Sequence, residues 1–207
     1  MRRYKFMYKN YIKVLLDKLL ALVAIIVLSV PMIVIAIIIK FDTKGSAIFK
    51  QKRLGKNRKK ITVYKFRTMC NNAYEIGGIA TRADDFRITK VGGFLRRKSL
   101  DELPQLINII KGEMAIIGPR PILDWEFEEY SNNPEYCKRY DVLPGLFCTV
   151  DVDYRATANR HIQFKMDAEY ADNITFLKDV RIFRGIIKTV LLEKNVYKEE
   201  EEKDTYA

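Results

Sequence analysis

A chain of 207 residues, 48% of them hydrophobic, can bury a core of its own and suits one domain with an appendage. Its 37 lysines and arginines against 26 acidic residues give a net charge of +11, which favours nucleic acid, an anionic membrane face or a phosphorylated substrate as partner. One histidine and three widely spaced cysteines argue against a histidine triad, a multi-histidine metal site and a disulfide framework. Any chemistry therefore has to use carboxylates, cations and an oxygen-preferring metal such as magnesium.

Residues 19–39 form an apolar run that only Ser29 and Pro31 interrupt, and about 20 such residues span a bilayer. The run is too long for a cleavable signal peptide. Lysines and arginines flank both of its ends, so the positive-inside rule places both ends on the cytoplasmic side. We expect a re-entrant helix that bends at Pro31, with the Ser29 hydroxyl satisfying a carbonyl near the break. The alternative is a straight signal-anchor helix that tolerates the proline.

The rest of the chain predicts an α+β fold, mostly helical with a few short strands. Strands are expected at 47–51 and 60–66, separated by a basic loop, and residues 114–117 read as a short strand or turn. Helices are expected at 70–76, 100–111, 123–140 with a break near Asn133, 164–171 and 174–192. The last of these has a wide apolar face with interspersed cations, which suits either an interfacial helix on an anionic membrane or an ordinary core helix.

The most informative stretch places three cations, residues 96–98, directly before the adjacent carboxylates Asp101 and Glu102. One interpretation is structural: Ser99 and Glu102 have capping-box spacing, and acidic side chains suit a helix N-terminus. The other is chemical. Neighbouring carboxylates repel each other unless a divalent metal or cations relieve them, and a carboxylate beside a metal-bound anionic substrate can attack it. The two interpretations are compatible, because a helix N-terminus is also an anion site.

Several ordered motifs resemble the bacterial sugar transferase family of small monotopic phosphoglycosyl transferases. They are Tyr64-Lys65-Phe66-Arg67-Thr68-Met69, Arg96-x-x-Ser99-Leu100-Asp101-Glu102-Leu103-Pro104-Gln105-Leu106, Lys111-Gly112-Glu113-Met114, Gly118-Pro119-Arg120-Pro121 and Asp167-x-x-Tyr170. The resemblance covers the chain from the N-terminal apolar helix to about Leu192.

The resemblance implies transfer of a sugar-1-phosphate from a UDP-sugar to polyprenyl (undecaprenyl) phosphate, with release of UMP, at the cytoplasmic face of the bacterial membrane. Asp101 is then the nucleophile, and Glu102 helps to hold Mg²⁺ or positions the second attack, so both are candidate metal ligands. Arginines suit bidentate phosphate binding. The expected substrate-binding residues are Arg67, Arg87, Arg96, Pro119, Arg120, Asp167 and Tyr170.

The same resemblance divides the chain into a re-entrant membrane helix (1–43), a catalytic domain on the cytosolic face (44–198) and an acidic tail (199–207). The expected partners are the UDP-sugar, the polyprenyl phosphate and an anionic bilayer, without nucleic acid. Neither the sugar nor the oligomeric state follows from the motifs.

This sequence departs from the family pattern at two places. Val30 separates Ser29 from Pro31, where the family has the serine directly before the proline. Within residues 144–155, the family's second glycine and its tryptophan give way to Cys148 and Thr149, and its Asn-Gly-Arg becomes Asp153-Tyr154-Arg155. We expect this segment to shape the choice of donor sugar.

Two other functions remain open from the residues alone. A membrane-tethered nucleic-acid-binding protein fits the basic stretch 50–60 and the 23 Phe and Tyr residues, although no recognition motif is present and the aromatics are scattered. The second alternative is a member of the family that has lost catalysis and acts as a scaffold. The presence of Asp101, Glu102 and Arg120 argues against it.

Overall fold

The computed structural model describes residues 2–77, 85–154 and 158–192. The described part is mostly helical with a few short strands, as the sequence predicts. The acidic tail 199–207 and Arg155 lie outside the described residues.

The N-terminal arm is one long helix with a π-helical turn near its start. It comprises α1 (Arg2–Met7), η1 (Tyr8–Ile12) and α2 (Lys13–Asp42). The stretch from Arg3 to Asp42 is long and apolar enough to cross a membrane, with a window of mean hydropathy 3.3 of which only 6% is buried. Its outward face therefore presents aliphatic side chains to the surroundings, such as Val27, Val30 and Ile33, which are 59% to 68% exposed.

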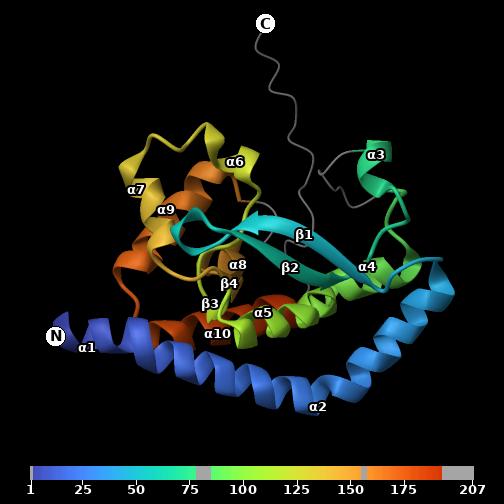
Figure 1. The fold of residues 1–207 in the computed structure, drawn as a ribbon, viewed down its shortest axis with the longest axis horizontal. Coiled ribbons are helices and arrows are strands. Elements are labelled where there is room, and N and C mark those ends of the chain that lie inside the picture. The colour runs from blue at the N-terminus through green and yellow to red at the C-terminus, as the bar shows by residue number, and fades with distance from the viewer. Residues whose placement is uncertain (1, 78–84, 155–157, 193–207) are drawn as a thin grey trace, which may run out of the picture.

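Helix α2 bends, as Pro31 predicts, and wraps around the rest of the chain (Figure 1). Residues before Pro31, such as Ala21 and Leu28, pack on α5 (Leu106–Lys111), whereas residues after it, such as Ile35 and Ile39, pack on α4 (Lys90–Arg97) and on Ile48 and Phe66 of the two predicted strands. Pro31 leaves the Val27 carbonyl without its helical donor. The Ser29 hydroxyl donates instead to the neighbouring Ile26 carbonyl (2.8 Å), so it lies at the break but satisfies a different carbonyl.

The two predicted strands form an antiparallel hairpin that crosses the middle of the molecule (Figure 1). Strand β1 (Ile48–Leu54) runs further than expected, and β2 (Lys60–Phe66) has the predicted bounds. A 3-10 turn, η2 (Lys56–Arg58), joins them. Two cations connect the hairpin to the segment 121–124. Arg53 donates to Pro121 O (2.7 Å), and Lys60 pairs with Asp124 (2.7 Å).

The middle of the chain consists of short elements. Helices α3 (Ala73–Gly77) and α4 (Lys90–Arg97) precede η3 (Leu100–Gln105) and α5 (Leu106–Lys111). Gly112 follows in a left-handed conformation, so α5 ends at Lys111, where the expected helix over 100–111 ends. The expected helix over 123–140 is divided near Asn133 into α6 (Asp124–Glu128), α7 (Pro134–Cys137) and η4 (Lys138–Asp141).

A small parallel pair of strands, β3 (Ala115–Ile117) and β4 (Gly145–Phe147), lies beneath the hairpin, and α8 (Thr149–Asp153) follows it. The sequence predicts β3, but neither β4 nor α8. The two backbones approach so closely that a Cβ on Gly145 would lie 2.1 Å from Gly118 N. Glycine at this position is therefore a packing requirement.

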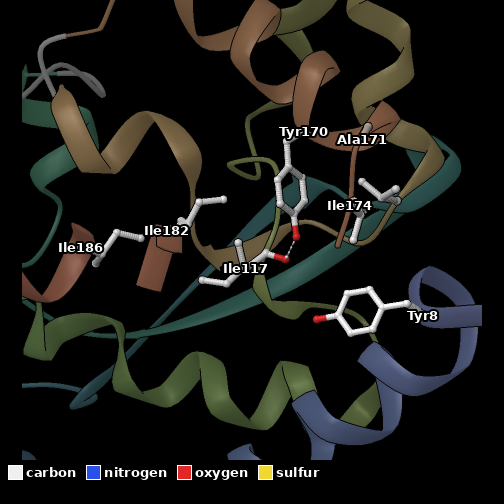
Figure 2. Packing of buried hydrophobic residues seen from close by; sticks show 8 residues of the cluster. Tyr8, Ile117, Tyr170, Ala171, Ile174, Ile182 and Ile186 are labelled. Carbon is white, nitrogen blue, oxygen red and sulfur yellow. Dashed lines mark hydrogen bonds between the residues drawn. The ribbon is translucent and has the colours of Figure 1, made fainter. Parts of the chain in front are cut away.

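The chain ends in α9 (Arg160–Asp172) and α10 (Phe176–Leu191). Helix α10 contributes to the core, which is one of the two roles that the sequence leaves open. Ile182 and Ile186 are buried in the core with Tyr170, Ile117 and Tyr8 (Figure 2), while Leu177 and Leu191 are more than 70% exposed. The N-terminal helix thus shares one core with the C-terminal helices.

Candidate active site

The helix that begins at Leu100 positions the carboxylate pair. Its first turn is 3-10, because Pro104 has no N–H to donate to the Leu100 carbonyl. The predicted capping box is wrong: Ser99 adopts a left-handed conformation (φ 54°) and makes no side-chain cap, and the Glu102 side chain turns to β2 instead. The buried amide of Asn108 in α5 fixes this helix to β2 by bonding Thr62 O (2.7 Å) and Tyr64 N (3.2 Å).

Asp101 is a buried carboxyl group surrounded by charge. Its residue is 9% exposed, and burial raises its pKa to about 6. Lys65 and Arg96 oppose this shift, while the neighbouring Glu102 adds to it. Asp101 is therefore a carboxylate at neutral pH whose charge is poorly hydrated, which is the condition of a carboxylate able to attack phosphorus.

Glu102 has a different environment from its neighbour. Lys65 Nζ from β2 donates to Glu102 Oε1 at 2.6 Å. Burial acts to raise the pKa of Glu102, but the charges of Lys65 and Arg120 outweigh it and hold that pKa below its ordinary value. The two adjacent carboxyls thus lie in different environments, since Lys65 bonds Glu102 directly and acts on Asp101 only through its charge.

Arg120 approaches the carboxylate pair from the loop after β3. Its Nη1 donates to Asp151 Oδ1 in α8 (3.1 Å), and this ion pair raises the pKa of Arg120 further. Asp151 in turn accepts from Cys148 N (3.0 Å), and burial raises the pKa of Asp151 despite the opposing charge of Arg120. Arg120 lies within electrostatic reach of both Glu102 and Asp101.

Behind Arg120 lies a fully buried ion pair. Arg139 Nη2 donates to Asp167 Oδ2 (2.8 Å) and to the Arg120 carbonyl. Burial raises the pKa of Asp167 to about 6, although Arg139 opposes it. Asp167 is 0% exposed, so in this conformation it acts on the site through Arg139 and the Arg120 backbone.

The other predicted substrate-binding residues occupy three places. Arg96 lies beside the site and donates to Thr68 Oγ1 (2.9 Å), and Pro119 is next to Arg120. Arg67 donates to the Thr43 and Lys44 carbonyls after α2. Arg87 donates to both carboxylate oxygens of Asp85 and to Ala73 O. The Tyr170 hydroxyl lies in the core, 2.7 Å from Asp179 Oδ1 and 3.0 Å from Ile117 O.

Sequence reasoning missed three residues of this site: Lys65, Asp151 and Arg139. Lys65 falls inside a quoted motif, and its place beside hydrophobic strand residues was an available signal. No signal in the sequence marks Asp151 or Arg139, because their contacts with Arg120 join segments that are 31 and 19 residues apart.

The altered segment contacts Arg120 through Asp151. Cys148 is fully buried with an extended backbone (φ −125°, ψ 155°) that any residue adopts, so a glycine is not required there for conformational reasons. Phe147 turns into the core, with its ring 6.1 Å from that of Phe183.

An apolar groove of about 350 Å³ opens between the second half of α2 and α4. Its lining residues are Ile35, Ile38, Lys90, Val91, Phe94 and Leu95. Leu95 is adjacent to Arg96 and packs in one cluster with Leu100 and Leu103 of η3. The inner side of the groove therefore packs against the helix that carries the carboxylate pair.

Comparison with known proteins gives the family. A protein described as UDP-N-acetylgalactosamine-undecaprenyl-phosphate N-acetylgalactosaminephosphotransferase from Aeromonas hydrophila is 36% identical over 185 residues, which is 87% of this chain but only 44% of that protein. The exopolysaccharide production protein PSS of Rhizobium leguminosarum bv. phaseoli is 36% identical over 83% of this chain and 90% of its own length. A UDP-glucose:undecaprenyl-phosphate glucose-1-phosphate transferase of Escherichia coli is 43% identical over 63% of this chain and 28% of its own. The bacterial sugar transferase model matches residues 8–193, and the chain belongs to that family.

Proposed function

We propose that this chain is a phosphoglycosyl transferase that moves a sugar-1-phosphate from a UDP-sugar to polyprenyl phosphate. The observation that carries the proposal is Asp101: a buried carboxylate, with a pKa of about 6, among the cations of Lys65, Arg96 and Arg120. Phosphoryl transfer depends on placement and charge neutralisation more than on acid–base groups. The names of the Aeromonas and Escherichia relatives support the same donor and acceptor classes.

In the first half-reaction, a carboxylate oxygen of Asp101 attacks the β-phosphorus of the UDP-sugar. The bond between that phosphorus and the bridging oxygen breaks, UMP leaves, and a phosphosugar–aspartate remains. In the second, a phosphate oxygen of the polyprenyl phosphate attacks the same phosphorus and releases Asp101. The sugar–oxygen bond stays intact throughout, and the product is a polyprenyl diphosphate sugar that begins glycan assembly.

In this proposal Arg120 and Arg96 neutralise the phosphate oxygens, and the charge that both exert on Asp101 supports this role. The Lys65 ammonium keeps Glu102 ionised beside the nucleophile. Asp151 holds one arm of Arg120, so this guanidinium is oriented before substrate binds.

The carboxylate pair fits Mg²⁺. Within the described ranges, no cluster of three or more acidic, His or Cys side chains forms a complete cage. Mg²⁺ needs only one or two carboxylates when substrate phosphates and water complete its shell, so Asp101 and Glu102 suffice. When bound, the ion neutralises the diphosphate charge.

The acceptor reaches the site from the membrane. We place the N-terminal helix in the cytoplasmic leaflet as a re-entrant helix, because its outward face is aliphatic while both halves of its bend pack on the same domain. The isoprenoid chain then lies in the groove between α2 and α4, with Lys90 at its edge matching the acceptor phosphate.

The test uses the full chain in nanodiscs with a panel of UDP-sugars and polyprenyl phosphate, and follows both UMP and lipid-linked sugar. We expect one sugar to support turnover in the wild type and none in Asp101→Asn. Lipid-linked product from Asp101→Asn would refute the assignment.

A groove variant, Val91→Trp, tests the acceptor site. It should raise the KM for a long-chain acceptor and leave the UMP released in the absence of acceptor unchanged. Leu177→Trp, which alters an exposed apolar residue of α10, is the matched control. An equal KM change in both variants would remove the groove from the proposal.

A further inference from the structure

Five polar side chains are buried where the N-terminal helix meets the C-terminal helices, and the proposed chemistry uses none of them. Between 1% and 7% of each residue is exposed. They are Tyr8, Lys13, Asp17, Tyr170 and Asp179, and we call them the Asp179 network.

Asp179 of α10 is the centre of this network. Its Oδ2 accepts from the Tyr8 hydroxyl (2.9 Å) and from Lys13 Nζ (2.8 Å), and its Oδ1 accepts from the Tyr170 hydroxyl (2.7 Å). Lys13 also contacts Asp17 Oδ2 at 3.1 Å. One cation, Lys13, lies between the two carboxylates, so removing Lys13 would leave buried negative charge uncompensated.

The network also holds the backbone of β3. Asp17 Oδ2 accepts from Ile116 N (3.3 Å), and the Tyr170 hydroxyl lies 3.0 Å from Ile117 O. Figure 2 shows the Tyr170 ring pointing at Ile117, with Tyr8 on the side of the N-terminal helix. The single proton of the Tyr170 hydroxyl is shared between Asp179 Oδ1 and Ile117 O, so Asp17 of the apolar helix and Tyr170 of α9 each contact one of two successive residues of the strand.

Strand β3 leads directly into Gly118, Pro119 and Arg120. On its other side, β4 holds the same segment: Gly118 N donates to Phe147 O (3.0 Å), and Gly145 N donates to Pro119 O (2.9 Å). The Arg120 guanidinium is only three residues beyond the Tyr170 contact. A displacement of β3 therefore moves Arg120 relative to Asp101.

We propose that the Asp179 network couples docking of the N-terminal membrane helix to the placement of Arg120, with Asp17 and Tyr170 as positioning residues. The inference rests on the proposed function for its kinetic consequence. Its structural consequence does not depend on the proposed function, because loss of a network hydrogen bond should loosen residues 116–120 whatever the reaction is.

The kinetic test is a double-mutant cycle between Tyr170→Phe and Arg120→Lys. It measures the rate of UMP release at saturating UDP-sugar without acceptor. Tyr170→Phe should lower this rate about tenfold in the wild type. In the Arg120→Lys background it should lower the rate less than threefold, because the guanidinium that the network positions is already absent there. Tyr136→Phe, which removes the contact of an exposed tyrosine hydroxyl with His161, should have little effect.

Amide hydrogen exchange supplies a readout that does not need activity. Asp17→Asn and Tyr170→Phe should each speed exchange at residues 116–120 more than in the hairpin β1–β2, and Tyr136→Phe should not. Additive rate losses in the cycle, or unchanged exchange at 116–120 in both folded variants, would overturn the inference. No UMP release from the wild type would instead refute the proposed function, and the exchange result would still decide the coupling.

Discussion

At the scale of single residues, the adjacent carboxyls Asp101 and Glu102 are distinguished by what lies opposite them. Lys65 bonds Glu102 directly, while Asp101 is buried without such a bond among the described contacts and has the higher pKa. The charge pattern of residues 96–102 predicts a site here. It does not predict which carboxyl is paired, because Lys65 and Glu102 are 37 residues apart in the chain.

The first prediction concerns Glu102→Gln. The amide keeps the size of the side chain but removes the charge that Lys65 and a bound Mg²⁺ would share, so the rate should fall roughly 100-fold. The Mg²⁺ concentration for half-maximal rate should also rise. Initial rates over a magnesium titration measure both, and an unchanged half-maximal concentration would exclude Glu102 from the metal site.

The second prediction is a pH dependence of donor attack. Asp101 reacts as a carboxylate, and burial raises its pKa to about 6. The donor kcat/KM at low Mg²⁺ should therefore rise about tenfold per pH unit below that value and level off above it. Saturating Mg²⁺ should move the midpoint lower, since a cation favours the ionised form. A flat profile between pH 5 and 7 at low Mg²⁺ would contradict this assignment.

At the scale of elements, the sequence predicts the helix and strand boundaries that depend on residues close together in the chain. Strand β2, the stop at Gly112 and the break at Asn133 match the structure because hydrophobic alternation, a left-handed glycine and a capping side chain act within a few residues. Strand β4 and helix α8 could not be predicted, because a three-residue strand exists only through its partner. The predicted capping box failed because Glu102 finds a stronger partner in Lys65.

The third prediction concerns residues 146–149, which connect β4 to α8. Replacing them with Ile-Thr-Gly-Trp should change the ranking of UDP-sugars, because it removes the Cys148 side chain, which hydrogen-bonds Asp151 opposite Arg120. Competition assays on the folded variant measure the ranking.

The exchange also removes Phe147 from the core, so Phe147→Thr alone is the control for lost packing. An unchanged ranking in a well-folded exchange variant would make the segment structural and place donor specificity elsewhere.

At the scale of the whole molecule, one bent apolar helix lies along the domain and contributes to three of its hydrophobic clusters. The sequence predicts the apolar run and the proline. The packing of both halves on one domain depends on tertiary contacts and needs the structure. This arrangement favours a helix that leaves the membrane on the side where it entered.

The fourth prediction is that the N-terminus and the domain lie on the same, cytoplasmic face. Single cysteines at Lys5 and Lys59, in a background without the three native cysteines, should resist an impermeant thiol reagent in intact cells and react after permeabilisation. The flanking cations motivate this topology. Labelling at position 5 from outside, with position 59 protected, would establish a spanning helix.

The most direct test of the central claim is the mass of the protein after mixing with its UDP-sugar alone. We expect an added sugar phosphate on the peptide that contains Asp101, and its loss when polyprenyl phosphate is supplied. We expect no addition in Asp101→Asn. Formation of lipid-linked sugar by a wild-type enzyme that never carries this mass would contradict the account, because the phosphate would then pass directly from donor to acceptor.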